Sequence, residues 1–343
     1  MNNRKHGNLF YFVVIGIAFG LAAFGVSGSP ASAKNLKLAH FLPPIHTNHT
    51  AVMAPWAEEV GKRSNGSLTI KVYPARQLGG TPPGQFKMVV SGTADIAFVT
   101  PNYTPGIFPR TSVVELPVPP ENAQHGTRIL YALFDKYLSE EYKAVKMIAM
   151  WAVDEFVLVT KDRPIRRLED MKGLKLRTPS RTQNKIIEAL GGVPVNMPIT
   201  QVFTSMDTGV LAGLAGGASI VFSFKIIDVG KYYTFGPSLS TIPLVLVMNK
   251  KVWNGLSPEH KKVIEETSQM GLGMKGAIAY DKKFKAAKNT IKNKPGREII
   301  MLSEAERKRF RDASRPVIES WIADMEKKGI PGREIWKARL AVK

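Results

Sequence analysis

Arg177 is the residue whose type and position in this chain best suit the binding of an organic anion. It closes a stretch in which Leu174 and Leu176 alternate with polar side chains, the pattern of a half-buried strand. Pro179 then stops the strand, because proline has no N–H to donate to a ladder. Ligands of open α/β sheets collect outside the carboxyl ends of strands, and a guanidinium there offers a carboxylate a planar fork of donors. The alternative interpretation is a surface arginine paired with a neighbouring acid.

Other residue types that carry chemistry form weaker patterns. His46 and His49 have a spacing that suits one face of a helix, but no further carboxylate or histidine lies nearby in sequence to complete a metal site. Asp95 precedes an expected strand and is assigned a cap or turn role. The glycines of residues 213–217 lack the spacing and the lysine of a phosphate loop. The sequence also has no nucleophile elbow, zinc-protease motif or Walker loop, so we expect no catalytic residue, metal ion or cofactor.

Alternating strands and helices must position Arg177. Strands are expected at residues 35–41, 68–73, 96–100, 146–151, 156–160, 174–177, 193–196 and 242–248. Helices are expected at about residues 49–64, 83–91, 124–138, 182–190, 200–208, 257–292 and 303–328. This alternation implies mostly parallel sheets covered by helices. Ser257 and Ser303 are candidate N-caps, and Gly271, Gly273 and Gly276 are expected to interrupt the longest helical pattern.

The N-terminus has the pattern of a secretory signal peptide. Arg4 and Lys5 precede an uncharged and mostly apolar run at residues 9–26, and the small residues 31–33 fit a cleavage site. We therefore expect residues 1–33 to be a signal peptide that is cut after Ala33, which would place the mature protein in the periplasm. The alternative is an uncleaved membrane anchor, and no later segment is apolar and long enough to span a membrane.

Composition limits the possible partners. The chain has 48 basic and 28 acidic residues and a formal net charge of +20, which can attract nucleic acid or an anionic membrane surface. The basic residues are spread along the chain without a nucleic-acid motif, so we interpret them as a solvated surface that favours anionic solutes and expect no nucleic-acid partner. The absence of cysteine excludes disulfides, thiolate metal sites and cysteine nucleophiles.

Six blocks of the sequence, taken in order, resemble the solute receptors of tripartite ATP-independent periplasmic (TRAP) transporters. They are NG before the strand 68–73, PARQLGG at 74–80, GTADIA at 92–97, RPIRRLEDMKGLKLRTP at 163–179, ALGGVP with MP at 189–198, and NKKVW with LS at 249–257. The likeness covers roughly residues 35–325. It implies an α/β, two-lobed periplasmic solute-binding protein fold of mostly parallel sheets flanked by helices, with one long helix spanning both lobes. Lobe I would comprise residues 34–153 plus about 245–290, and lobe II residues 154–244 plus about 291–343, with the ligand cleft between the lobes.

The resemblance also assigns roles. In this family the arginine that corresponds to Arg177 clamps the carboxylate of the transported acid. Many members carry a second arginine where Phe156 stands, and a DGxEN run whose asparagine binds the ligand where Gly216 stands. Because a second buried carboxylate without a partner is costly, these departures favour a monocarboxylate with an apolar or aromatic body. Further residues expected around the ligand are Tyr103, Asn102, His46, His49, Trp151, Phe222 and Phe235, and for the aromatic ones plain hydrophobic core is the alternative.

The resemblance implies a function without catalysis. The chain would be an extracytoplasmic receptor that binds an organic acid in the interlobe cleft, closes over it by a hinge motion and delivers it to the membrane permease subunits of a TRAP transporter. Three alternatives stay open: a C4-dicarboxylate receptor of the same family, a sensory receptor that presents its ligand to a membrane kinase, and a secreted enzyme acting on an anionic substrate.

Overall fold

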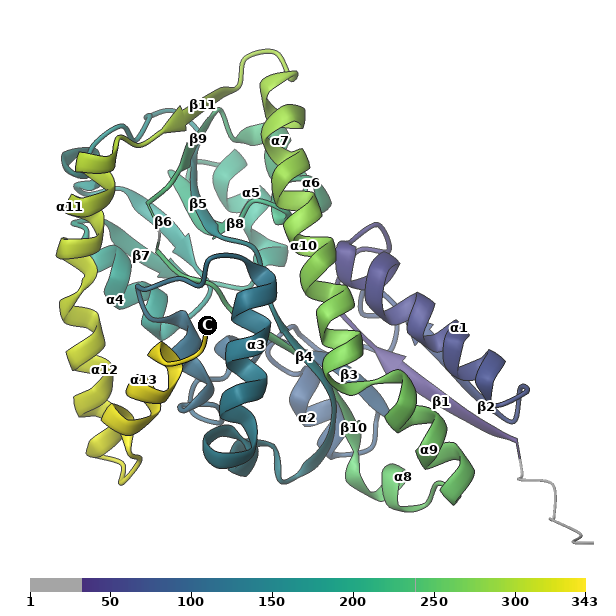
Figure 1. Ribbon diagram of the computed structural model, residues 1–343. Helices are drawn as coiled ribbons and strands as arrows, with labels where there is room; N and C mark the ends of the chain where they lie inside the picture. Colours follow the sequence, from purple (N-terminus) through teal and green to yellow (C-terminus); the bar gives the residue numbers. More distant parts are fainter. Residues whose placement is uncertain (1–32, 238) are drawn as a thin grey trace, which may run out of the picture. The chain divides into compact units, whose positions relative to one another are not determined.

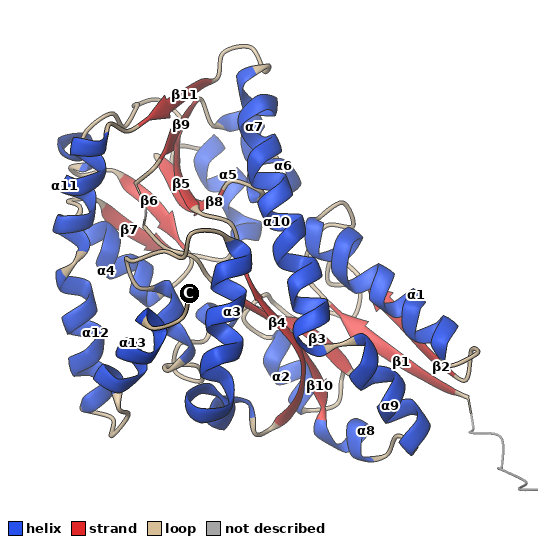
Figure 2. Ribbon diagram, in the orientation of Figure 1, coloured by secondary structure: helices blue, strands red, loops and turns tan. Residues whose placement is uncertain are grey.

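The strands of the computed structural model gather into two separate sheets (Figures 1 and 2). The structure describes residues 33–237 and 239–343, so the expected signal peptide lies, apart from Ala33, outside the described residues. The first sheet has the order β2-β1-β3-β10-β4, with bounds Leu68–Tyr73, Lys34–Ala39, Ile96–Val99, Pro243–Asn249 and Val145–Ala152. The second has the order β11-β9-β5-β8-β6-β7, with bounds Glu298–Met301, Tyr232–Phe235, Phe156–Thr160, Gly213–Gly217, Lys175–Thr178 and Val193–Asn196.

Two strands run against the direction of their neighbours. In the first sheet β10 is antiparallel to β3 and β4, whereas β1 is parallel to β2 and β3. In the second sheet β5 is antiparallel to β8 and β9, whereas the remaining pairs are parallel. These are the strands by which the chain crosses from one sheet to the other. Every residue of β3, β5 and β10 is buried, as expected for strands that have both faces of the sheet covered.

Helices cover both sheets (Figure 2). Their bounds are α1 Ala54–Arg63, α2 Gln85–Val90, α3 Ala123–Leu133, α4 Arg181–Ala189, α5 Val202–Asp207, α6 Ile220–Ser223, α7 Ile226–Val229, α8 Lys250–Asn254, α9 Pro258–Thr267, α10 Gln269–Lys292, α11 Glu304–Ser314, α12 Pro316–Glu326 and α13 Gly332–Leu340. Helix α1 packs on β2, α3 on β4, and α4 on β6 and β7. Ser257 and Ser303 accept hydrogen bonds from the backbone N–H groups of His260 and Glu306, which confirms both predicted N-caps.

The long helix α10 contacts both sheets, through β4 in the first and β11 in the second (Figure 1). The sequence predicted interruptions at the glycines, but the break lies earlier, at Ser268 and Gln269, where Gln269 has a φ of 59°. All three glycines lie inside α10, and two of them serve close packing. A Cβ at Gly273 would overlap the carbonyl oxygen of Met150, and one at Gly276 would come within 3.1 Å of the ring of Trp151. Absence of side chains at these positions therefore lets α10 lie directly on β4.

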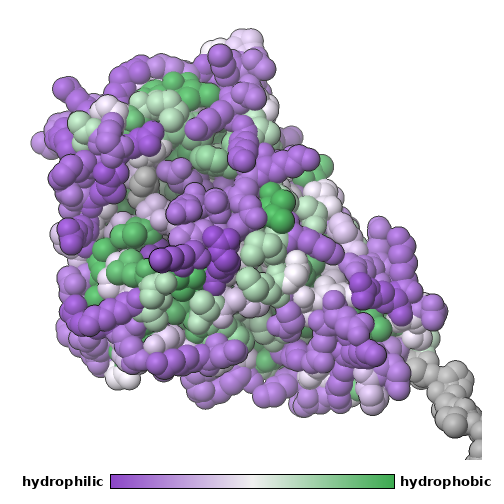
Figure 3. Space-filling view, in the orientation of Figure 1, coloured by the Kyte–Doolittle hydropathy of each residue, from purple (hydrophilic) through white to green (hydrophobic). Residues whose placement is uncertain are grey.

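The face seen in Figure 3 is mostly hydrophilic, with hydrophobic side chains in separate groups. Among the described residues, no helix combines the length and the apolarity needed to cross a membrane. The charged side chains of this surface form ion pairs that are largely exposed, such as Lys136 with Glu334 and Arg333 with Glu319. Pairs of this kind contribute little to stability, about 0–1 kcal/mol each.

The division into two lobes at the expected boundaries stays a prediction. Strand β10 belongs to the first sheet and β11 to the second. The C-terminal segment forms α13. This helix contacts α12 and also α3, which packs on the first sheet.

Gly273 provides a test of the packing between α10 and β4. We expect Gly273→Ala to lower the free energy of unfolding by about 1–3 kcal/mol, the usual cost of overpacking, because the new methyl group would displace the strand carbonyl. Gly271 is the matched control, since a Cβ there meets no atom within 4 Å, and Gly271→Ala should be neutral or stabilising because alanine is the better helix former. Urea denaturation of the two variants measures the difference, and equal stabilities would contradict this account of α10.

Candidate functional site

A cavity lies between the two sheets, where several strands end at their carboxyl side. It is lined by residues that follow β1 and β3, by the connection from β4 to β5, and by the ends of β6 and β8. This is the position at which open α/β sheets bind ligands. The cavity has a volume of about 50 Å³, and its lining consists of Phe41, Leu42, His46, Asn48, Phe98, Thr100, Tyr103, Val153, Asp154, Phe156, Arg177, Ile199, Gly216, Gly217, Ile220, Phe224, Ile242, Leu244 and Tyr280.

Arg177 reaches the cavity from the end of β6 and is only 3% exposed. Its Nε donates to the carbonyl oxygen of Met197 at 2.9 Å, and its Nη2 donates to the hydroxyl of Tyr103 at 3.1 Å. Burial lowers the pKa of Arg177, and Tyr103 opposes that effect. None of the ion pairs formed between described residues includes this guanidinium. A guanidinium has five N–H donors, so three remain for an anion in the cavity.

The hydroxyl of Tyr103 has a proton to give. Its oxygen accepts from Arg177 Nη2 and from the backbone N–H of Ile199, each at 3.1 Å. Both partners are donors only, and a hydroxyl has one O–H and two lone pairs. With both lone pairs in use, the phenolic O–H must donate to a third group. Thr100, which also lines the cavity, has a buried hydroxyl with no hydrogen-bond partner among the described residues. Arg177, Tyr103 and Thr100 are thus three lining residues with donors that no described residue uses.

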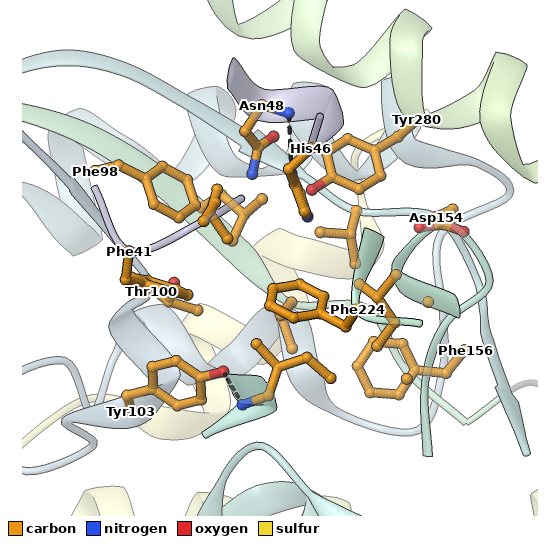
Figure 4. A pocket seen from close by; sticks show the side chains of 18 of the residues that line it. Phe41, His46, Asn48, Phe98, Thr100, Tyr103, Asp154, Phe156, Phe224 and Tyr280 are labelled. Carbon is orange, nitrogen blue, oxygen red and sulfur yellow. Dashed lines mark hydrogen bonds between the residues drawn. The ribbon is translucent and has the colours of Figure 1, made fainter. Parts of the chain in front are cut away.

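The walls of the cavity are apolar. Figure 4 shows the rings of Phe41, Phe98, Phe156 and Phe224 around the space between Tyr103 on one side and His46 on the other. Aliphatic side chains from β10 and from the loops and short helices around both sheets complete the walls. An aromatic body would contact rings and methyl groups here, and such contacts stabilise a complex by burying apolar surface.

Asp154 is the one carboxyl among the lining residues, and it is engaged by the protein. Its two oxygens accept from the backbone N–H and from the hydroxyl of Ser219, each at 2.9 Å. Burial raises the pKa of Asp154 to about 7, against the opposing effect of these hydrogen bonds. We therefore assign Asp154 to fixing the turn that follows β8. A Cβ at Gly217 would approach its carboxylate within 2.5 Å, so glycine is required there.

Five of the ten expected ligand contacts line the cavity: Arg177, Phe156, Tyr103, His46 and Gly216. At Gly216 the side chain of Ile220 fills the space, since its Cδ1 would lie 2.8 Å from an added Cβ. The site therefore gains an apolar wall where the family often has an amide.

The other five expected residues lie outside the cavity lining. Asn102 donates to the carbonyl oxygen of Pro179 at 3.1 Å, and His49 contacts His40, with 2.9 Å between Nδ1 and Nε2. Trp151 donates from its indole to Asn48 Oδ1 at 3.2 Å. Phe222 packs at the edge of the core, and Phe235 meets Phe284 edge to face with 5.9 Å between ring centroids.

The structure thus brings in lining residues that the sequence did not suggest, including Asn48, Thr100, Asp154, Phe224 and Tyr280. They come from loops, from a helix terminus and from α10, and no periodic pattern marks them. Thr100 is the last residue of an expected strand, and its position at a strand end was the only usable signal. Among the described residues, no group of three or more His, Cys, Asp or Glu side chains could hold a metal ion.

Comparison with known proteins gives the family. Residues 38–324 match the profile described as "Bacterial extracellular solute-binding protein, family 7". The chain belongs to this family. The match confirms the resemblance carried by the six sequence blocks and the α/β fold with one long helix, and it makes the chain a TRAP solute receptor. Receptors of this class bind small organic acids and work with membrane permease subunits.

Three relatives illustrate the similarity of this TRAP receptor to known proteins. A marine metagenome TRAP solute-binding protein specific for aromatic acid ligands, crystallised with metahydroxyphenylacetate, is 31% identical, has a TM-score of 0.86, and the match covers 89% of this chain and 97% of that one. A TRAP solute-binding protein from Rhodoferax ferrireducens T118, with copurified benzoate, is 28% identical, has a TM-score of 0.87, and the match covers 90% and 97%. The 2,3-diketo-L-gulonate-binding periplasmic protein of Escherichia coli K12 is 26% identical over 93% of this chain and 94% of its own length.

A second buried carboxyl lies beside the strand of Arg177. Glu115 is 1% exposed, and its side chain accepts a hydrogen bond from the hydroxyl of Ser180, which caps α4 by accepting from the N–H of Gln183 at 3.1 Å. Burial raises the pKa of Glu115 to about 8. The pKa values of two histidines are shifted in the opposite direction. Burial lowers the pKa of His46 to about 3. Burial, together with the charges of His49 and His46, lowers the pKa of His40 to about 3.

These shifts give the stability of the receptor a defined pH dependence. The folded chain keeps the proton of Glu115 between about pH 4.5 and pH 8, where the unfolded chain has lost it, so this contribution to stability falls as the pH rises through that window. Unfolded histidines take up protons below about pH 6.5, which lowers stability on the acid side. We therefore expect the free energy of unfolding to decline from about pH 6.5 to pH 8.

The free energy of unfolding of the variant Glu115→Gln should decline less over this interval, by on the order of 1 kcal/mol. The variant keeps an acceptor for Ser180. Urea denaturation at half-unit steps of pH measures the difference. Glu121→Gln, at an exposed position, should follow the unmodified receptor. Parallel curves for Glu115→Gln and the unmodified protein would show that Glu115 does not carry this dependence.

Proposed function

We propose that this receptor binds an aromatic or otherwise apolar monocarboxylate in the cavity, with the carboxylate on Arg177. The observation that carries the proposal is a buried guanidinium without a carboxylate partner among the described residues, at the end of an otherwise apolar cavity. A charge-assisted bidentate bond to a carboxylate is the interaction that such a group forms best. The ligands of the two TRAP relatives described above, metahydroxyphenylacetate and benzoate, have this chemistry.

The charge of the cavity lining favours one carboxylate over two. Arg177 is the one arginine or lysine among the lining residues. A C4-dicarboxylate would bring a second carboxylate against Phe156, Ile220 and neighbouring apolar groups, where an unpaired charge is strongly disfavoured. A benzoate-like acid would instead place its ring against these side chains.

Ligand entry requires motion. The cavity volume of about 50 Å³ is well below the roughly 150 Å³ of an apolar cavity that binds benzene. We propose that the two lobes open by a hinge motion to admit the acid and close over it. Closure brings Tyr103 and Asn102, which follow β3 of the first sheet, against Ile199 and Pro179, which flank the second sheet.

The proposal extends to the cellular setting. Residues 1–33 would direct secretion and be removed after Ala33, so that the mature receptor works in the periplasm and releases its acid to the permease. It would act without chemical conversion of the acid. The cavity supports this, because the carboxylate of Asp154 is engaged by Ser219 and no serine, cysteine or lysine nucleophile is among the lining residues.

Arg177→Met tests the carboxylate site. We expect it to weaken benzoate binding by about 2–5 kcal/mol, the usual cost of removing one partner of a buried charged hydrogen bond. Stability without ligand should be unchanged or higher, because the variant no longer buries an unpaired charge. Isothermal calorimetry and thermal unfolding measure the two effects.

Arg339 supplies the control for this experiment. It is also 3% exposed, donates to the carbonyl oxygen of Val118, and lies outside the cavity lining. Arg339→Met should leave benzoate affinity unchanged. Undiminished affinity in Arg177→Met, or equal losses in both variants, would refute the clamp.

Tyr103→Phe tests whether the O–H of Tyr103 donates a hydrogen bond to the carboxylate of the ligand. Loss of its O–H removes one donor to the carboxylate, and we expect a loss of affinity of roughly 1.5–3 kcal/mol, the range for hydrogen bonds to charged groups. Tyr131→Phe is matched, because the Tyr131 hydroxyl also accepts from a backbone N–H, that of Met150 at 3.1 Å, and Tyr131 does not line the cavity. Calorimetry should show unchanged affinity for Tyr131→Phe, and an unchanged affinity in Tyr103→Phe would remove the hydroxyl from the site.

A further inference from the structure

The proton of His46 is fixed by the backbone of its own loop. The N–H of Asn48 donates to His46 Nδ1 at 3.1 Å. A backbone N–H can only donate, so Nδ1 must be the unprotonated nitrogen, and in a neutral imidazole the other nitrogen then carries the proton. His46 is therefore an Nε2–H donor.

Burial favours the neutral form of the His46 imidazole. His46 is 3% exposed, and burial together with the nearby charge of Lys283 lowers the pKa of its imidazole to about 3. Protonation at Nδ1 would also point a second N–H at the N–H of Asn48. The donor at Nε2 is thus a neutral one at any physiological pH.

This donor faces the cavity. In Figure 4 the ring of His46 points away from its bond to Asn48 and into the space beside Phe224. The two rings meet edge to face, with 5.7 Å between centroids. No hydrogen bond joins Nε2 to another described residue. Two polar neighbours are already engaged, since Asp154 accepts from Ser219 and Asn48 Oδ1 accepts from Trp151. The hydroxyl of Tyr280, which Figure 4 shows near the ring, forms no hydrogen bond with His46.

The donor also lies away from the carboxylate end. Figure 4 shows His46 and Tyr103 on opposite sides of the cavity, with the ring of Phe224 between them in this view. Arg177 donates a hydrogen bond to the hydroxyl of Tyr103. A ligand held by Arg177 would therefore extend past apolar walls toward a single neutral N–H.

We propose that His46 is a specificity-determining residue that donates a hydrogen bond from Nε2 to an uncharged acceptor on the ligand ring, remote from the carboxylate. The proposal rests on the proposed function and narrows its substrate class to ring-substituted aromatic monocarboxylates, with a hydroxyl group as the simplest substituent. Such an acid would satisfy both ends of the cavity. An unsubstituted acid, or one with a methyl group in that place, would bury the N–H without a partner, which is costly.

The first experiment varies the ligand and leaves the receptor intact. Calorimetry on the mature protein compares benzoate with the 3- and 4-hydroxybenzoates and with the 3- and 4-methylbenzoates, which have similar size but no acceptor. We expect one hydroxybenzoate to bind roughly 5-fold more tightly than its methyl counterpart, since a neutral hydrogen bond contributes about 1 kcal/mol. Equal affinities within both pairs would overturn the proposal.

The second experiment varies the receptor. In His46→Leu the preference for the hydroxyl over the methyl compound should fall to within about 2-fold. His46→Gln, which keeps an N–H donor, should retain part of the preference. His125→Leu, on α3 and outside the cavity lining, is the control and should keep the full preference. A full preference in His46→Leu would overturn the assignment to this residue.

The outcomes separate the two proposals. Arg177-dependent binding of benzoate without any preference for an acceptor would refute the role of His46 and leave the proposed function standing. Failure of all five acids to bind would refute both. The tautomer has a direct signature as well, because long-range proton–nitrogen NMR should show His46 with Nδ1 unprotonated at neutral pH, and a protonated Nδ1 would contradict the proposal.

Discussion

The site depends on a positive charge that the protein buries without neutralising it. Removing a guanidinium from water costs several kcal/mol, and a buried arginine ordinarily has a carboxylate partner. Arg177 has only a carbonyl oxygen and a phenolic oxygen as hydrogen-bond partners among the described residues. The fold tolerates this cost because β6 is fixed between β7 and β8 and ends where the cavity begins. An anion that enters the cavity recovers much of that cost, so the charge contributes to affinity.

Two backbone N–H groups determine that the side chains of Tyr103 and His46 act as hydrogen-bond donors. The N–H of Ile199 occupies one lone pair of the Tyr103 hydroxyl, and the N–H of Asn48 occupies Nδ1 of His46. In both cases a group that could either donate or accept is left as a donor toward the cavity. The cavity therefore selects acceptors: a charged one near Arg177 and an uncharged one near His46.

Two of the predicted residues that line the cavity have a position that follows from the strands of the sequence. Arg177 was located by alternation followed by proline, and Phe156 by counting along the family's blocks. Strand β8 was missed, because glycine-rich sequences have low strand propensity. Its glycines are required for other reasons, since a Cβ at Gly213 would overlap the carbonyl oxygen of Val159 in the neighbouring strand. The helix break at Gln269 was predicted at the wrong place, at the glycines of α10. Glycine in a sequence signals both flexibility and close packing, and only the structure shows which of the two applies.

Most of the lining residues beyond strand ends were not predicted, because long-range packing decides their place. Trp151 was expected in the cavity, but its indole is turned to Asn48 and covered by α10 at Gly276. Tyr280 reaches the cavity from α10, some 130 residues further along the chain. No local pattern reports contacts at such separations.

The hydrogen bonds that build the site also join the two sheets, and this links binding to closure. Tyr103, from the first-sheet side, contacts both Arg177 and Ile199 on the second-sheet side, and Glu115 contacts Ser180 in the same region. An acid bound to Arg177 and Tyr103 would touch both sides at once. A ligand shifts a conformational equilibrium only through its different affinity for the two states, and a carboxylate that bridges the two sides provides that difference. An acid that reached Arg177 alone could bind the open form equally well and would not favour closure. On this argument the phenolic O–H of Tyr103 matters more for closing the receptor than its single hydrogen bond suggests.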